Sequence, residues 1–188
     1  MKCNWLKPLF TCMGVKYGKN VSFHGMPVIF NKRGATLNLG DRVTVKSSFL
    51  SNLVGLYQRT IIVTRTPDAE IKIGNDVGIS GATIYARKSI TIGDNTLIGG
   101  NVKILDNDFH PLEIEARNAD VKEKIQAKPI MIGKNCFIGC NAIILKGTEL
   151  KDGCIVGAGA VVSGKFEENS IIAGNPAKVI KKIVERIE

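Results

Sequence analysis

Aromatic side chains are scarce in this sequence. They make up 6% of the 188 residues, with a single tryptophan, although 44% of the residues are apolar and 20 are glycine. The apolar residues are therefore mostly Ile, Val, Leu and Ala, and with the many glycines they favour short β-strands and tight turns over a helical bundle. No shift in composition marks a boundary, so we expect one domain over residues 1–188.

The sequence also lacks a long apolar run near its start. The first residues, MKCNWLKPLFTCMG, contain no stretch with the length of a signal peptide or a membrane span, which argues against export. Trp5, Leu9 and Met13 recur every fourth residue and predict a short helical segment over residues 1–14. Such a helix most often covers the end of a core. The alternative is weak association with a membrane surface through Lys2 and Lys7.

Paired cysteine motifs are missing as well. The cysteines are odd in number and have neither CxxC nor metal-knuckle spacing. Reduced thiols in a cytoplasmic protein are the simplest interpretation, and we expect no metal.

Acidic residues are in the minority, because 26 Lys and Arg face 17 Asp and Glu and leave a net charge of +9. This charge suits an anionic partner, such as nucleic acid, acidic lipid or a phosphate-bearing cofactor. The basic residues are scattered, and no basic run is interleaved with aromatics as in proteins that bind single strands. We therefore expect no nucleic-acid partner.

A repeat of six residues, each led by a large residue, dominates what is present. This period predicts a coil with three flat sides, in which each side is a strand of about six residues and each leader points toward the axis. Three sides make a coil of about 18 residues, and leaders of successive coils stack. The leaders are Ile73, Ile79 and Tyr85, then after one extra residue Ile92, Ile98 and Ile104, and finally Ile132, Ile138, Ile144, Leu150, Val156 and Val162.

The repeat explains two features that resemble binding motifs. Cys136 and Cys154 are 18 residues apart, so we expect them to stack as equivalent core residues rather than act as ligands. The glycine-rich VGAGAVVSG stays in the hexad register and lacks the strand-loop-helix setting of a phosphate loop. The repeat breaks off at residues 107–128, a charged loop that contains His110.

The IGDN, IGGN and VGAGAVV hexads, the DFHP loop and the closing IIAGNPAKVIKKI resemble the hexapeptide-repeat acyltransferases. Within that family they are most similar to the galactoside, maltose and polysaccharide O-acetyltransferases, over about residues 15–184. The resemblance implies a mainly β fold, a single-stranded left-handed parallel β-helix. It also implies a homotrimer, with acetyl-CoA as acyl donor in the groove between neighbouring helices. Past the last hexad, Val179, Ile183 and Ile187 share one face and predict a C-terminal helix over residues 177–188.

His110 matches the catalytic histidine of the family through its DFHP context. A histidine is well suited to take the proton of an attacking hydroxyl, so we interpret it as the general base. His24 has no such context and is interpreted as structural. A carboxylate would orient the base, and the candidates by position are Asp106, Asp108, Glu113 and Glu115. We favour Asp108, since alternate residues of an extended segment share a face.

The resemblance also implies binding residues. For acetyl-CoA they are Cys140, Ala158, Ser163, Gly164, Lys178 and Lys181, with Lys165 in place of the lysine that some relatives carry where this chain has Gly164. For the acceptor they are Ser80, Asp106 and Arg117. Relatives that modify sugars hold the acceptor with an asparagine where this chain has Ser80 and Gly81, which leaves the acceptor's identity open. A backbone amide near Cys140 would stabilise the oxyanion.

The predicted function is transfer of acetyl from acetyl-CoA to a hydroxyl of a sugar or glycan precursor in polysaccharide biosynthesis. An N-acetyltransferase for amino sugars is the nearest alternative, since only the acceptor atom differs. A non-catalytic β-helix scaffold is another, although it would not need the DFHP loop. A zinc carbonic anhydrase of the same fold needs three histidine ligands, and the chain has only His24 and His110.

Overall fold

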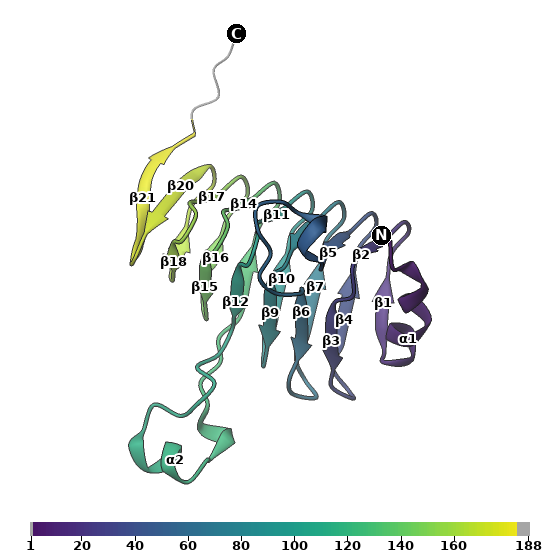
Figure 1. Cartoon of the computed structure of the whole chain (residues 1–188). Helices are drawn as coiled ribbons and strands as arrows, with labels where there is room; N and C mark the ends of the chain where they lie inside the picture. The colour runs from purple at the N-terminus through teal and green to yellow at the C-terminus, as the bar shows by residue number, and fades with distance from the viewer. Residues whose placement is uncertain (1, 184–188) are drawn as a thin grey trace.

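The computed structural model describes residues 2–183 and shows a mainly β chain wound into three sheets around a common core (Figure 1). Consecutive strands fall in turn on three sheets, which we call I, II and III. Each circuit of the coil therefore adds one strand to every sheet. All strand pairs are parallel except the last, β20 with β21. The fold is therefore a parallel β-helix.

Sheet I has seven strands: β1 (Val15–Tyr17), β4 (Thr36–Leu39), β7 (Glu70–Ile73), β10 (Ser89–Ile92), β13 (Ile130–Ile132), β16 (Glu149–Leu150) and β19 (Lys165–Phe166). Sheet II has eight: β2 (Ser22–His24), β5 (Thr44–Lys46), β8 (Gly78–Ser80), β11 (Leu97–Ile98), β14 (Phe137–Ile138), β17 (Ile155–Val156), β20 (Ser170–Gly174) and β21 (Ala177–Lys182). Sheet III has six: β3 (Val28–Asn31), β6 (Ile61–Thr64), β9 (Thr83–Ala86), β12 (Lys103–Leu105), β15 (Ile143–Leu145) and β18 (Val161–Val162).

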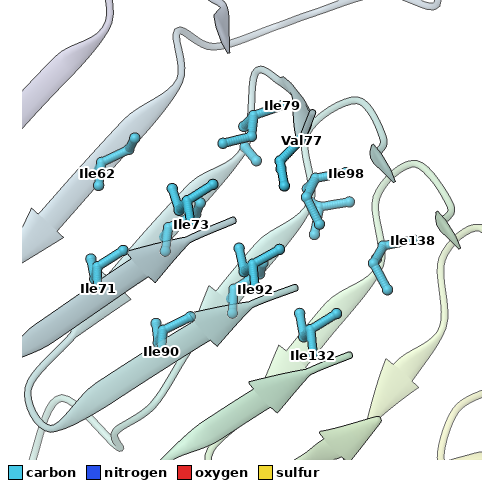
Figure 2. Close-up of a cluster of buried hydrophobic side chains, with 14 of the residues drawn as sticks. Ile62, Ile71, Ile73, Val77, Ile79, Ile90, Ile92, Ile98, Ile132 and Ile138 are labelled. Carbon is cyan, nitrogen blue, oxygen red and sulfur yellow. The ribbon is translucent and has the colours of Figure 1, made fainter. Parts of the chain in front are cut away.

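Columns of isoleucine fill the axis of the coil. Successive strands place Ile73, Ile92 and Ile132 directly above one another, and Ile79 and Ile98 form an equivalent column on sheet II (Figure 2). All five side chains are at most 3% exposed. A branched side chain has few rotamers in a strand, so identical residues stack at the strand spacing with little loss of entropy. The predicted inward leaders are confirmed at these positions.

Tyr85 was predicted to be an inward leader, and this prediction is wrong. Ile84 pairs with Ile104 and is fully buried, whereas Tyr85 pairs with Leu105 and is only half-buried. Across the turn at Gly81 the inward Ile79 and Ile84 are five positions apart, whereas their partners Ile98 and Ile104 are six apart. Since side chains alternate between faces, a shift of one residue turns Tyr85 to the outer surface of sheet III.

The turns from sheet I to sheet II need left-handed backbone. Asp76, Asn95 and Asn135 have φ between +54° and +57°, and short polar residues tolerate that region best. The coils also approach closely there, because a Cβ on Gly93 would lie 2.6 Å from the backbone carbon of Gly133. Glycine is therefore required by its neighbour in the next coil.

Two segments interrupt the coil at its corners. Residues 47–60 connect β5 to β6 and include the short helix η2 (Phe49–Ser51). Thr60 closes this insertion, because its amide donates to Ser47 Oγ at 2.9 Å and its hydroxyl donates to the Lys46 carbonyl at 2.7 Å. A longer segment connects β12 to β13 and projects away from the stack (Figure 1). It includes α2 (Ile114–Asn118) and η3 (Lys122–Lys124), and we call its residues 107–128 the arm.

The two ends of the coil are covered differently. At the start, the predicted helical segment is present as η1 (Asn4–Leu6) and α1 (Lys7–Cys12), with Leu6 and Phe10 buried against the first coil. Trp5 and Leu9 face outward and are 65% and 56% exposed. No helix in residues 2–183 has the length and hydropathy of a membrane span.

At the other end, the helix predicted over residues 177–188 is wrong for residues 177–182. These residues form β21, which turns back at Asn175–Pro176 and pairs antiparallel with β20. Residues 184–188 lie outside the described part of the chain. The spacing of Val179 and Ile183 fits a helix, but β20 offers an open edge whose amides and carbonyls need partners. Strand pairing satisfies that edge, and a helix would not.

Candidate functional site

The arm leaves the coil through a narrow neck at the corner between sheets III and I. The Asp108 amide donates to the Gln126 carbonyl at 3.1 Å, and the Lys128 amide donates to the Asp106 carbonyl at 2.9 Å. Asn107 and Ala127 form an antiparallel bridge between these two bonds. The two strands of the neck therefore hold each other, and the residues just beyond it have a defined direction.

His110 stands at this neck on a three-residue turn. Its amide donates to the Asp108 carbonyl at 2.7 Å, and the central residue, Phe109, has φ +63°. The Asn107 side chain supports the turn by accepting the Phe109 amide at 2.9 Å. A non-glycine residue at positive φ is strained and persists only where its surroundings hold it. The turn thus presents an exposed imidazole that has no hydrogen-bond partner within residues 2–183.

The ring of Phe109 anchors the turn to the coil. It lies 4.9 Å from the ring of Tyr85, with an angle of 52° between the planes. Such tilted aromatic pairs are stabilised beyond the area that they bury. Tyr85 is available for this contact only because it faces outward, so the corrected register of β9 directly supports the position of His110.

Asp108 was predicted to orient the imidazole, but within residues 2–183 its carboxylate contacts a lysine and not the His110 ring. Its carboxylate forms an ion pair with Lys146, which lies at the same corner one coil further on, between β15 and β16. Lys146 was missed by sequence reasoning because the two residues are 38 positions apart. Only the 18-residue coil length, applied across the arm, could have aligned them. The ion pair fixes the neck rather than the ring.

Asp106 was predicted to bind the acceptor, which does not fit a side chain that is 0% exposed. Its carboxylate accepts the amides of Arg87 and Lys88 at 2.8 and 2.7 Å, and the Asn107 side chain at 3.1 Å. Burial raises the pKa of Asp106, and these hydrogen bonds oppose that rise. The residue is a structural carboxylate beneath the arm. Arg117 also has a structural contact, since its guanidinium donates to the carbonyls of Pro111 and Leu112 at 3.3 and 3.1 Å.

Ser80 lies at a different corner of the coil, between sheets II and III. Its hydroxyl accepts a hydrogen bond at 3.1 Å from Asn52 of the 47–60 insertion. Both residues line a groove of about 220 Å³ on the outer face of sheet II, together with Lys46, Leu97 and Phe137. Within one chain, the structure does not bring Ser80 and His110 together.

The predicted acetyl-CoA residues fall into three groups. Cys140 and Ala158 occupy the sheet II–III corner in successive coils, where the Gly159 amide donates to the Cys140 carbonyl at 2.9 Å. Ser163 and Gly164 lie at the sheet III–I corner, and Lys165 follows them in β19, where it pairs with Glu149 at 3.0 Å. Lys178 and Lys181 lie exposed on β21. One chain therefore offers small residues along one corner and basic residues at the C-terminal end of the coil. Within residues 2–183, no three His, Cys, Asp or Glu side chains could together hold a metal.

Comparison with known proteins agrees with this architecture. The model of the hexapeptide repeat of succinyl-transferase matches residues 89–104 and 129–163, the coils on both sides of the arm. The galactoside acetyltransferase structure in complex with coenzyme A has a TM-score of 0.60 and 25% identity, covering 96% of this chain and 70% of that chain.

Two curated relatives extend the comparison. A putative lipopolysaccharide biosynthesis O-acetyl transferase of Escherichia coli is 37% identical over 53% of each chain. A putative acetyltransferase of Saccharomyces cerevisiae is 32% identical over 148 residues, which cover 75% of this chain and 72% of the relative. The chain spans about half the length of several other curated relatives that it matches. The match to the hexapeptide-repeat model, the shared coil architecture and the extended similarity to an acetyltransferase agree with one another. The chain belongs to the hexapeptide-repeat acetyltransferases.

Proposed function

We propose that this protein transfers an acetyl group from acetyl-CoA to a hydroxyl of a sugar or glycan precursor, with His110 as general base. The observation that carries the proposal is the exposed imidazole on a strained, anchored turn at the neck of the arm. A surface histidine with only a structural role would not need a turn of this kind. The family supplies the donor, and the sugar and lipopolysaccharide relatives support the acceptor class.

The chemistry needs one proton to move twice. As the acceptor oxygen attacks the thioester carbonyl, the imidazole takes the hydroxyl proton and becomes imidazolium. A backbone amide near Cys140 stabilises the negative charge on the carbonyl oxygen of the tetrahedral intermediate. The intermediate then collapses with cleavage of the carbon–sulfur bond, and the imidazolium returns the proton to the departing thiolate. The products are the acetyl ester and CoA, and His110 ends neutral.

A complete site on this proposal needs two subunits, because Ser80 and His110 lie at different corners of one coil. The outer surfaces of the sheets support such an assembly. Leu97 and Phe137 are neighbours on the outside of sheet II and are 53% and 47% exposed. Sheet I instead carries charged residues such as Lys72 and Glu149 in its outward column. We therefore propose a homotrimer of left-handed coils in which the outer face of sheet II packs against a neighbouring subunit.

The first experiment measures thiol release from acetyl-CoA with a panel of sugars, glycan precursors and amino sugars. Wild-type protein should acetylate at least one hydroxyl acceptor, and His110→Ala should lower kcat by a factor of about 10² to 10⁴. Full activity of His110→Ala would exclude the proposed base. Transfer only to amino sugars would replace the O-acetyltransferase with the N-acetyltransferase, and absence of both CoA binding and transfer would favour a scaffold.

The second experiment tests whether the site is shared. His110→Ala and Ser80→Glu damage different corners, so a mixed trimer should contain one interface in which both residues are intact. Co-expression should therefore restore part of the activity that each variant alone has lost. Recovery no greater than the sum of the separate variants, in a mixture shown by mass spectrometry to contain both chains, would place both residues in the same subunit's site.

A further inference from the structure

The outer face of sheet III carries a hollow beside the base of the arm. It has a volume of about 340 Å³ and is lined by Phe30, Val63, Arg65 and Tyr85. None of these residues belongs to the site described above, apart from the support that Tyr85 gives to Phe109. The hollow is thus a separate feature, and its lining combines two aromatic rings with one cationic group.

The hollow follows from the order of side chains along the sheet. Phe30 pairs with Val63, and Val63 pairs with Tyr85, so the three form one outward column. A small valine between two rings leaves a depression, since the outer members of the column are about 10 Å apart, twice the strand spacing. The rings shield Val63, which is only 9% exposed, while Phe30 remains 43% exposed.

Arg65 closes one side of this depression. It follows Val63 by two positions, with Thr64 buried between them, so it also faces outward. Its amide donates to the Ala86 carbonyl at 2.7 Å, which fixes the backbone at the edge of sheet III. The side chain is exposed and forms no ion pair within residues 2–183. A guanidinium without a carboxylate partner is free to take an anion with two parallel hydrogen bonds.

The hollow is adjacent to the general base. The Phe109 ring contacts Tyr85 at 4.9 Å, and His110 is the next residue along the turn. Arg65 and the neck of the arm both lie at the corner between sheets III and I. A ligand that fills the hollow would therefore extend from the rings toward His110, with any anionic substituent near Arg65.

We propose that this hollow binds the acceptor as an anionic sugar, whose ring packs on Phe30 and Tyr85 and whose phosphate or carboxylate pairs with Arg65; the inference rests on the proposed function. The C–H groups of a pyranose face carry partial positive charge, and the π-face of an aromatic ring is negative, so the two surfaces attract. Phosphate and carboxylate share the planar, bidentate recognition by guanidinium. The site therefore selects for negative charge on the acceptor.

The experiment measures binding without acetyl-CoA, by saturation-transfer NMR, for glucose 1-phosphate, glucuronic acid and methyl glucoside. Wild-type protein should bind at least one of the anionic sugars roughly tenfold or more tightly than methyl glucoside. Arg65→Met should remove this preference and leave methyl glucoside binding unchanged. The two anionic sugars distinguish a phosphate from a carboxylate as the preferred group.

Two further variants separate charge from packing. Phe30→Ala should weaken binding of all three sugars to a similar degree, because it removes a ring and no charge. Arg59→Met is the matched control, since Arg59 is an exposed arginine in the 47–60 insertion at the opposite edge of sheet III. It should bind like the wild type. An equal loss in Arg59→Met and Arg65→Met would show only a long-range effect of net charge and would overturn the proposal.

Other results would also overturn it. Equal affinity of the wild type for neutral and anionic sugars would exclude selection by charge. A rise in the KM for acetyl-CoA in Arg65→Met, with sugar binding unchanged, would assign the guanidinium to the donor. Failure of the proposed function gives a different result: the charge-dependent binding and its loss in Arg65→Met would persist in a protein that transfers no acetyl group.

Discussion

Lys146 and Asp108 form an ion pair that joins two successive coils at the neck of the arm. The side chains are 20% and 21% exposed, so solvent screens the pair less than a pair on the open surface. Asp108 is also the residue whose carbonyl accepts the His110 amide. The coil beyond the arm therefore holds the turn that presents the general base, and Lys146 is a positioning residue on the proposed function.

Replacing Lys146 with methionine should lower kcat by roughly 10- to 100-fold, because small displacements of a base are costly in rate. The KM for acetyl-CoA should change less than kcat, because the lysine pairs with Asp108 and not with a predicted acetyl-CoA residue. The urea midpoint should fall only slightly, as partly exposed pairs contribute about 1 kcal/mol or less. Lys134→Met, which breaks the more exposed pair with Asp94, is the control and should keep full activity.

A merely structural role for Lys146 would give another pattern. If Lys146 affected activity only through stability, kcat and the urea midpoint would fall together in both Lys146→Arg and Lys146→Met. On the positioning role, Lys146→Arg keeps the ion pair and should recover most of kcat. Asp108→Asn should resemble Lys146→Met, and the double variant should be no worse than either single variant, because each change already removes the same contact.

The reversed orientation of Ile84 and Tyr85 can be tested by stability. Ile84→Ala should lower the free energy of unfolding by about 2–5 kcal/mol, since it opens a cavity in a packed column. Tyr85→Leu should cost less than about 1.5 kcal/mol but should lower kcat, because it removes the ring that Phe109 contacts. Urea unfolding and steady-state kinetics measure both effects. If Tyr85→Leu lowered the free energy of unfolding more than Ile84→Ala, Tyr85 rather than Ile84 would be the inward residue.

Asp106 should make stability depend on pH. Its pKa in the folded protein is raised by burial, so the unfolded chain releases the proton first and wild-type stability falls as pH rises from about 4 toward the folded pKa. Asp106→Asn does not titrate at this position. Its urea midpoint, relative to wild type, should therefore rise across this window. A difference that shrinks with increasing pH would show that the carboxylate is stabilised as the anion.

The small residues at the sheet II–III corner provide a test of the donor site. Ala158→Glu adds bulk and negative charge where the proposal places the pantetheine arm and its phosphates. The KM for acetyl-CoA should rise at least about tenfold with little change in the urea midpoint, because Ala158 is exposed. Ile155→Glu, on the outer face of sheet II, should instead disturb assembly, which light scattering would detect. An unchanged KM in Ala158→Glu would place the donor elsewhere.

Much of the coil was predictable because one physical requirement repeats. A branched aliphatic must face the axis on each side, so Ile73, Ile98 and Ile104 follow from the period alone. Tyr85 was misplaced because two large apolar residues, Ile84 and Tyr85, stand side by side in the sequence. A fixed period of six residues cannot reveal that the spacing across the turn at Gly81 is shorter by one residue. At the C-terminal end, helical periodicity was a weaker factor than the open edge of β20, which only the assembled sheet reveals.

The candidate site also has one part that the sequence predicts and another that only the assembled coil reveals. His110 lies in a short local motif and could be found from sequence. The residues that position it, Lys146 and Tyr85, come from other coils, and their contacts arise only when the coils stack. Asp106 and Asp108 were both candidates to orient His110, because both are acidic and close to it, and Asp108 was favoured. Their roles differ because one side chain points beneath the arm and the other toward the next coil.

The neck of the arm has a consequence for how such a protein can change. Its two strands enter and leave the coil at adjacent points, Asp106 and Lys128, which are joined by a hydrogen bond of 2.9 Å. The pairing of β12 with β15 and of β10 with β13 continues across this point. The segment beyond the neck can therefore be lengthened, shortened or exchanged without moving any rung of the stack. The length and sequence of the arm can therefore vary independently of the packing of the coil.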